Sequence, residues 1–105
     1  MNNFMITGTL KGLKKQISNS GYSKTSAFLI SRDSSRNKYQ KYFVTFWRNE
    51  ADEILKTYCI GDCLRITGVI NFNDNTRKYE LIGHKFEKIQ WNDDDKRFLP
   101  VSVCT

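Results

Sequence analysis

Four positions in the stretch from residue 39 to residue 48 combine side chains that suit contact with unpaired nucleic-acid bases. Lys41, Phe43, Thr45 and Trp47 stand at every second position, so in an extended strand they share one face. The two rings offer stacking platforms, and the lysine offers a partner for a phosphate. This face predicts single-strand binding. The alternative, that the rings cover a subunit interface or lie under a loop, stays open.

The segments on either side of this strand are basic. Further candidates for binding nucleic acid there are Lys14, Lys15, Tyr22, Lys24, Arg32, Arg36, Lys38 and Tyr39. Weaker candidates in the second half of the chain are Arg65, Phe72, Arg77 and Tyr79. Residues 1–48 hold nine basic side chains against one acidic one, a net charge of +8, whereas the whole chain carries +6. Charge of one sign on one half indicates a polyanionic partner, with a merely solvated basic surface as the alternative.

The histidine and the cysteines lack the spacing and the partners of a catalytic or metal-binding site. His84 is the only histidine, and no acidic residue is placed to orient it in a nucleophile–histidine pair. Cys59, Cys63 and Cys104 lack the spacing of a zinc site. They are interpreted as reduced thiols of a cytoplasmic protein. We therefore expect no enzyme, no metal and no cofactor.

Neither a membrane span nor a secretory signal is predicted. The sequence has no apolar run that approaches the length of a span. Its first residues lack the basic and apolar segments of a signal peptide. We expect a cytoplasmic protein without a membrane partner.

The dominant period of the apolar residues is two, which predicts strands. We expect strands over 4–10, 26–31, 39–48, 63–72 and 77–89, a basic loop over 11–24, a loop over 32–38 and a hairpin turn at 73–76. Between the third and fourth strands one helix is expected, with Asn49 as its N-cap and Gly61 ending it in a left-handed conformation. Its apolar stripe is Ala51, Ile54, Leu55 and Tyr58.

This order of elements predicts the fold class. Three strands, one helix and two strands, all short and antiparallel, predict an all-β, five-stranded OB-fold barrel with the helix between strands 3 and 4. We expect residues 1–91 to form this nucleic-acid-binding domain. Residues 92–105 are expected to form a short tail, in which 97–103 is a candidate extra strand.

An ordered set of motifs resembles the bacterial, phage and plasmid family of single-stranded-DNA-binding proteins. Residues 4–10 resemble its first strand, 42–47 its aromatic third strand, and 61–70 its Gly-x-x-(apolar)-x-(apolar)-x-Gly segment. The resemblance covers about residues 3–90. It implies an OB fold and sequence-independent binding of single-stranded DNA in replication, recombination or conjugative transfer. By the same resemblance Phe43, Thr45 and Trp47 fall on the face that contacts bases.

The resemblance also implies a homodimer or homotetramer. The first strand commonly forms the dimer contact, and Met5, Thr7 and Thr9 on its outward side fit that role, with an ordinary solvated face as the alternative. The family's long linker and acidic tip are not found after residue 91. Recruitment of the usual partners through that tip is therefore not expected, and a compact, diverged member of this kind would suit a mobile genetic element.

Two other functions remain open from the residues alone. An OB module can bind RNA by the same stacking and phosphate contacts. It can also serve as a protein-interaction subunit of a replication complex, which the apolar segment 98–103 would favour.

Overall fold

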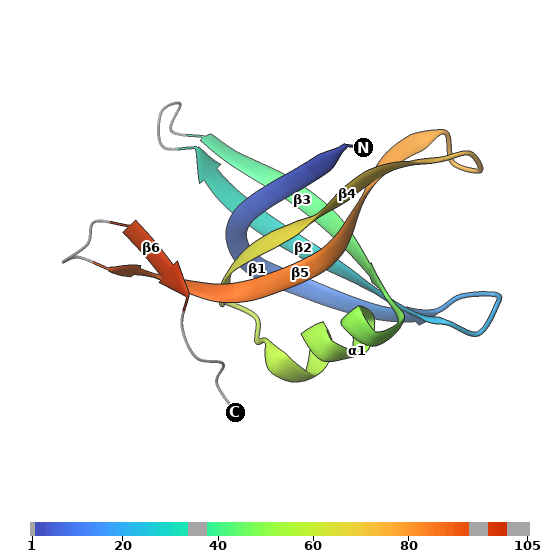
Figure 1. Ribbon diagram of the computed structural model, residues 1–105, viewed down its shortest axis with the longest axis horizontal. Coiled ribbons are helices and arrows are strands. Elements are labelled where there is room, and N and C mark those ends of the chain that lie inside the picture. Colours follow the sequence, from blue (N-terminus) through green and yellow to red (C-terminus); the bar gives the residue numbers. More distant parts are fainter. Residues whose placement is uncertain (1, 34–37, 93–96, 101–105) are drawn as a thin grey trace.

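The described part of the chain folds into strands and one helix. In the computed structural model, residues 2–33, 38–92 and 97–100 are described. In chain order the elements are β1 (Asn3–Ile17), β2 (Ser23–Asp33), β3 (Lys38–Trp47), α1 (Arg48–Thr57), β4 (Cys63–Asn73), β5 (Lys78–Asn92) and β6 (Arg97–Pro100) (Figure 1).

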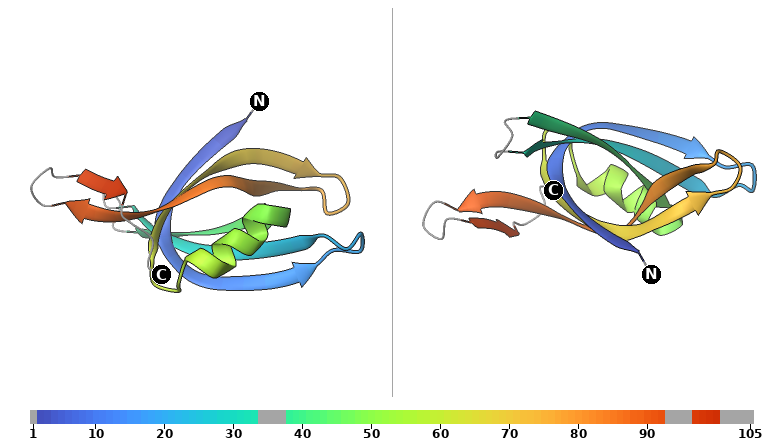
Figure 2. Two further views of the ribbon diagram at one scale, coloured as in Figure 1. Left: turned by 60° about the horizontal axis from the view of Figure 1, so that its bottom comes forward. Right: turned by 90° about the horizontal axis from the view of Figure 1, so that it is seen from above.

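Strands β1 to β5 close into a barrel. Antiparallel pairing gives the order β3-β2-β1-β4-β5, and a short parallel pairing of β3 with β5 closes it at Val44 with Leu81 and Thr45 with Ile82. This confirms the predicted five-stranded OB barrel with one helix between the third and fourth strands. Strand β6 pairs antiparallel with β5 at the end of the molecule away from the β1–β2 and β4–β5 hairpins (Figures 1 and 2).

Strand β1 is long because a bulge bends it between two partners. Its first half pairs with β4 and its second half with β2, and the register shift between Leu10 and Gly12 leaves Lys11 as the extra residue. A bulge of this kind bends a strand and increases its twist, which gives β1 its deep curve (Figure 1). At the bend, a Cβ on Gly8 would lie 3.0 Å from the Ile30 carbonyl oxygen, so glycine permits the close approach of β2.

The predicted loop over 11–24 is wrong except at residues 18–22, which form the turn at Gly21. Residues as far as Ile17 continue β1 and pair with the start of β2, for example Lys14 with Ser26. This part of the hairpin extends beyond the barrel, and its residues 14–17 are all exposed. Since it buries few side chains, it has no apolar alternation, and the sequence carried no strand signal there.

The barrel interior follows the predicted alternation. Its fully buried apolar side chains are Leu10, Ala27, Leu29, Val44, Phe46, Leu64 and Ile66, and α1 contributes Ala51 and Ile54. The helix packs against β2, β3 and β5 (Figure 2). The buried Thr25 hydroxyl donates to the Ala51 carbonyl at 3.0 Å, so its polar group is satisfied and β2 is tied to α1.

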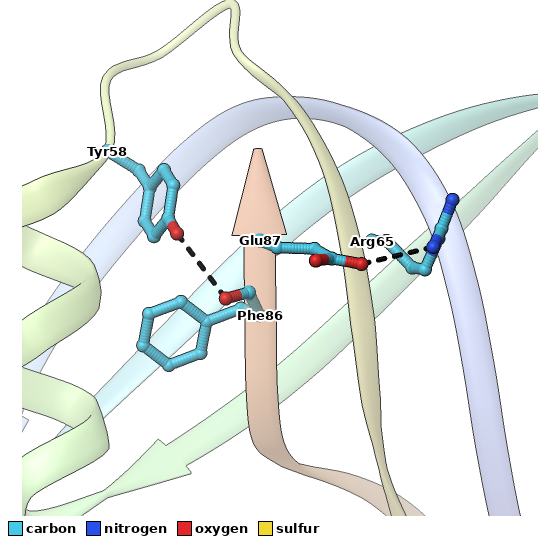
Figure 3. A network of polar contacts seen from close by, with 4 residues as sticks. All are labelled: Tyr58, Arg65, Phe86 and Glu87. Atoms are coloured by element: carbon cyan, nitrogen blue, oxygen red, sulfur yellow. Dashed lines mark hydrogen bonds and ion pairs between the residues drawn. The ribbon is translucent and has the colours of Figure 1, made fainter. Parts of the chain in front are cut away.

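Aromatic rings join the helix end to β5. The Phe86 ring meets Phe46 edge-on at 5.3 Å and Tyr58 edge-on at 5.4 Å. The Tyr58 hydroxyl donates to the Phe86 carbonyl at 3.3 Å (Figure 3). Burial, followed by the nearby Glu53 carboxylate, raises the pKa of Tyr58. A Cβ on Gly83 would overlap the Phe46 ring, so glycine at this point of β5 makes room for the largest fully buried side chain of the described residues.

Both predicted helix ends are wrong. The helix begins at Arg48 after Trp47 in extended conformation, with no capping side chain, so Asn49 lies inside the first turn. At the other end Tyr58 is already extended, and its ring packs into the core from that position. Gly61, with φ +102°, instead belongs to the turn into β4, where its N–H donates to the Leu10 carbonyl at 2.8 Å.

Candidate nucleic-acid interface

The outward side of the first three strands gathers the strongest sequence candidates. Cross-strand register places Phe28 beside Phe43, and Lys24 beside Trp47. The register of β1 adds Lys14 to the same row. We call this surface the stacking face, and it consists of Lys14, Lys24, Ser26, Phe28, Lys41, Phe43, Thr45 and Trp47. Its residues come from three strands because side chains that pair across a sheet point to the same side.

Phe43 lies at the centre of the stacking face. Its ring stacks on Phe28 with centroids 4.9 Å apart and planes 20° apart. Phe43 nevertheless remains 66% exposed. The Phe28 ring therefore supports one side of Phe43, and a broad apolar surface is left open to solvent. Such a ring can stack on a planar ligand with little loss of side-chain freedom.

Two cation–aromatic pairs lie together at the end of this face. The Lys24 ammonium is 5.3 Å from the centroid of the half-buried Trp47 ring. Next to it in the chain, the Arg48 guanidinium lies 4.1 Å from the centroid of the Tyr22 ring. Arg48 was not among the nucleic-acid-binding residues predicted from the sequence, although a basic residue directly after Trp47 could have indicated it.

Two of the predicted basic residues do not join this surface. Lys15 pairs with Thr25, whose side chain is buried under α1, so Lys15 lies on the opposite side of the strand from Lys14. Arg65 on β4 forms an ion pair with Glu87 on β5 at 3.1 Å (Figure 3). This carboxylate compensates the charge of Arg65 locally.

Other candidates lie at the far end of β3. Lys38 and Tyr39 are exposed there, and Tyr39 lines a hollow with Thr9 and Ile30 that no residue of the stacking face lines. Arg32 pairs with Tyr39 through the backbone. The Arg32 side chain and the whole of Arg36 fall outside the described part of the structure.

A second pair of exposed rings lies on the β4–β5 hairpin. Phe72 and Tyr79 are cross-strand neighbours, and their rings meet edge-on at 5.1 Å. They share the side of the hairpin that faces the core further along, at Leu81. Arg77, with φ +57°, forms the turn beside them. The structure thus places Phe72, Arg77 and Tyr79 together, but apart from the stacking face.

Comparisons with known proteins identify the fold. No model of a protein family and no curated protein matches this sequence. Among solved structures, the SSB domain of a Synechococcus protein superposes with a TM-score of 0.69 at 14% identity, covering 82% of this chain and 93% of that one. Rim1, a mitochondrial single-stranded-DNA-binding protein of S. cerevisiae, gives 0.72 at 10% identity, covering 83% and 92%. The chain has the OB fold of these domains.

The protein priB of Ralstonia solanacearum has a similar fold, with a TM-score of 0.68 at 13% identity over 84% of this chain and 98% of that chain. In each comparison the shared part is nearly the whole of the other chain, so the likeness concerns a complete OB domain. No helix in the described part of the chain is long and apolar enough to cross a membrane.

Proposed function

We propose that this OB barrel binds single-stranded DNA without sequence preference. Bases stack on Phe43 and Trp47, and the lysines of the stacking face hold the phosphates. The observation that carries this proposal is the Phe43 ring, supported from behind by Phe28 and open to solvent on a basic face. Stacking contributes about 1–3 kcal/mol per base in proteins of this kind. One solved structure of the same fold, Rim1, is named as a single-stranded-DNA-binding protein.

The spacing of the rings sets the minimum length of oligonucleotide that can contact both. Phe43 and Trp47 are four residues apart on β3, a distance of about 13 Å along an extended strand. Adjacent stacked bases lie about 3.4 Å apart. The two rings therefore contact bases separated along the strand, and a dinucleotide is too short to reach both.

We further propose the setting in which the barrel acts. It serves DNA replication, recombination or transfer in the cytoplasm, as a homodimer or homotetramer. The outward side of β1 provides the subunit contact, because Met5 is 68% exposed there and an exposed apolar side chain on a strand is suited to burial against a second copy.

Binding of labelled oligo-dT, followed by fluorescence anisotropy at two salt concentrations, tests the proposal. We expect binding that weakens with salt, with quenching of tryptophan fluorescence. Phe43→Ala is expected to raise Kd roughly 5- to 150-fold, which corresponds to the loss of one stacked base. Ile60→Ala removes an exposed apolar side chain from the loop between α1 and β4 and is the matched control.

Three outcomes would contradict the proposal. Unchanged affinity of Phe43→Ala would refute the assignment of the stacking face. Failure of the wild type to bind at low salt would refute nucleic-acid binding and favour a protein-interaction module. A clear preference for the matched RNA oligomer in competition would make the barrel an RNA-binding module, because contacts to the 2′-hydroxyl distinguish RNA from DNA.

A further inference from the structure

Arg48 occupies a backbone conformation that ordinary side chains avoid. It has φ +56° at the junction between β3 and α1. In this left-handed region the Cβ is crowded by the backbone, and glycine is the residue that enters it without cost. A residue other than glycine is uncommon at such a position, which makes the contacts of the Arg48 side chain worth examining.

The Arg48 side chain is placed over one ring and keeps its hydrogen-bond donors. The guanidinium lies over Tyr22, and a guanidinium can contact a ring through its face while the N–H groups on its edge stay available. Arg48 is exposed, and it has no carboxylate partner among the described residues. The edge of this cation is therefore open to an external acceptor.

The ring under Arg48 is held by an ordered turn. The Ser18 N–H donates to the Tyr22 carbonyl at 2.9 Å, and the Tyr22 N–H donates to the Ser18 hydroxyl at 3.1 Å. Gly21, with φ +86°, allows the chain to turn at this point. These two hydrogen bonds hold the backbone of Tyr22 in the turn that ends the β1–β2 hairpin, and Tyr22 presents its ring there.

The surrounding charges favour an anion on one side of Arg48. Lys24 lies on that side, two residues from Tyr22 and over the Trp47 ring. Arg48 and Trp47 also line a hollow with the acidic Glu50 and residues 82–84 of β5, which neither Tyr22 nor Lys24 lines. The side of Arg48 next to Tyr22 and Lys24 therefore gathers two cations and two rings.

We propose that Arg48, stacked on Tyr22, is a phosphate-binding residue that guides the single strand from the stacking face onto the turn of the β1–β2 hairpin. The inference rests on the proposed function and adds a contact that the motifs did not indicate. Arg48 donates from its edge to a phosphodiester oxygen, and Lys24 neutralises the next phosphate. The base between them lies against Trp47 or Tyr22.

Arg48→Gly tests this role, because glycine removes the side chain and suits the backbone. We expect Kd for oligo-dT to rise about tenfold, the effect of losing one charge-assisted hydrogen bond. The slope of log K against log salt should become shallower by about 0.7, the value for one phosphate on a single strand. Tm should stay within about 3 °C of wild type, because relief of the backbone offsets the lost ring contact.

Two further variants separate the contributions. Arg48→Lys keeps the charge, so we expect it to keep the wild-type salt slope. Arg77→Gly relieves the same left-handed conformation at the β4–β5 turn, where the arginine has no ring contact among the described residues. This variant measures the change in Tm that comes only from relief of the left-handed backbone conformation.

The two proposals fail in different ways. If wild-type protein binds oligo-dT and Phe43→Ala weakens it, but Arg48→Gly leaves both Kd and the salt slope unchanged, Arg48 has no role in binding and this inference is overturned. If the wild type does not bind at low salt, the proposed function itself fails.

Discussion

At the scale of single residues, the aromatic side chains of the stacking face differ in how they are supported. Phe43 rests on another ring, whereas Trp47 is half-buried and lies against a lysine. The second arrangement joins stacking and charge at one place, since an ammonium over an indole ring remains available to a phosphate. Removing that ammonium should therefore change the electrostatic part of binding without removing a ring.

Lys24→Ala tests this electrostatic part. The salt slope of oligo-dT binding is expected to become shallower by about 0.7, because one phosphate contact is lost. The control is Lys56→Ala, which removes the same charge from the exposed last turn of α1. Titrations at several salt concentrations measure both slopes. Equal slopes for the two variants would show that Lys24 does not contact the nucleic acid.

The two cysteines of the described chain differ in environment. Cys59 is exposed, whereas Cys63 at the start of β4 is half-buried, and burial raises the pKa of the Cys63 thiol. The thiolate is the reactive form, so at a given pH below this pKa Cys63 carries less of it. We expect iodoacetamide to modify Cys59 faster than Cys63 at pH 8, as measured by peptide mass spectrometry. Equal rates would contradict this burial.

At the scale of elements, the barrel depends on irregular positions in otherwise regular strands. The register shift beside Gly68 in the β4–β5 ladder leaves His84 as an extra residue of β5, next to Gly83. The missing side chain of Gly83 makes room for Phe46 from β3. The bulge and the glycine occur beside the point where β5 meets β3, which indicates that they help β5 to close the barrel.

Gly83→Ala is expected to destabilise the fold. The added methyl group would overlap the fully buried Phe46 ring, and overpacking of a core costs about 1–3 kcal/mol. For a domain of this size each kcal/mol lowers Tm by about 4–8 °C. Thermal unfolding followed by circular dichroism measures the change.

The matched control for this change is Gly12→Ala in β1. There a Cβ would meet only the Phe28 Cβ, at an ordinary 3.7 Å, and the residue needs no positive φ. We expect a much smaller change in Tm. If the two variants unfolded at the same temperature, packing against Phe46 would not be the reason for glycine at position 83.

At the scale of the whole molecule, the hairpins and the outward side of β1 are separate surfaces. The β1–β2 and β4–β5 hairpins project together from one end of the barrel (Figures 1 and 2). Met5, on the half of β1 that pairs with β4, lies apart from the stacking face. Self-association through β1 would thus leave the stacking face open.

Met5→Asp tests the proposed self-association. A charge at the centre of a subunit contact opposes burial, so we expect the oligomer to dissociate to monomers. Sedimentation velocity measures the mass, and Ile60→Asp is the control at another exposed apolar position. A wild-type monomer, or an unchanged oligomer of Met5→Asp, would refute the contact through β1.

The sequence by itself determined the fold class and the two sides of most strands. Alternation of apolar residues encodes the inward and outward sides directly, as in β3, where Val44 and Phe46 are buried and Phe43 is exposed. It also determined that one helix follows β3, because the apolar stripe of 51–58 has helical spacing. The exact helix ends were not predicted, because the apolar stripe continues to Tyr58 although the helix stops at Thr57.

Only the tertiary structure decided which of the candidate residues come together. Lys14 and Lys15 are neighbours of the same type, but the register of β1 against β2 directs them to opposite sides. In the sequence Arg65 is one of many basic residues, and only the pairing of β4 with β5 shows that Glu87 lies beside it and compensates its charge. Arg48 and Tyr22 are 26 positions apart, and they meet because the β1–β2 hairpin reaches the junction of β3 with α1. These contacts depend on strand pairing between distant segments, which local periodicity does not specify.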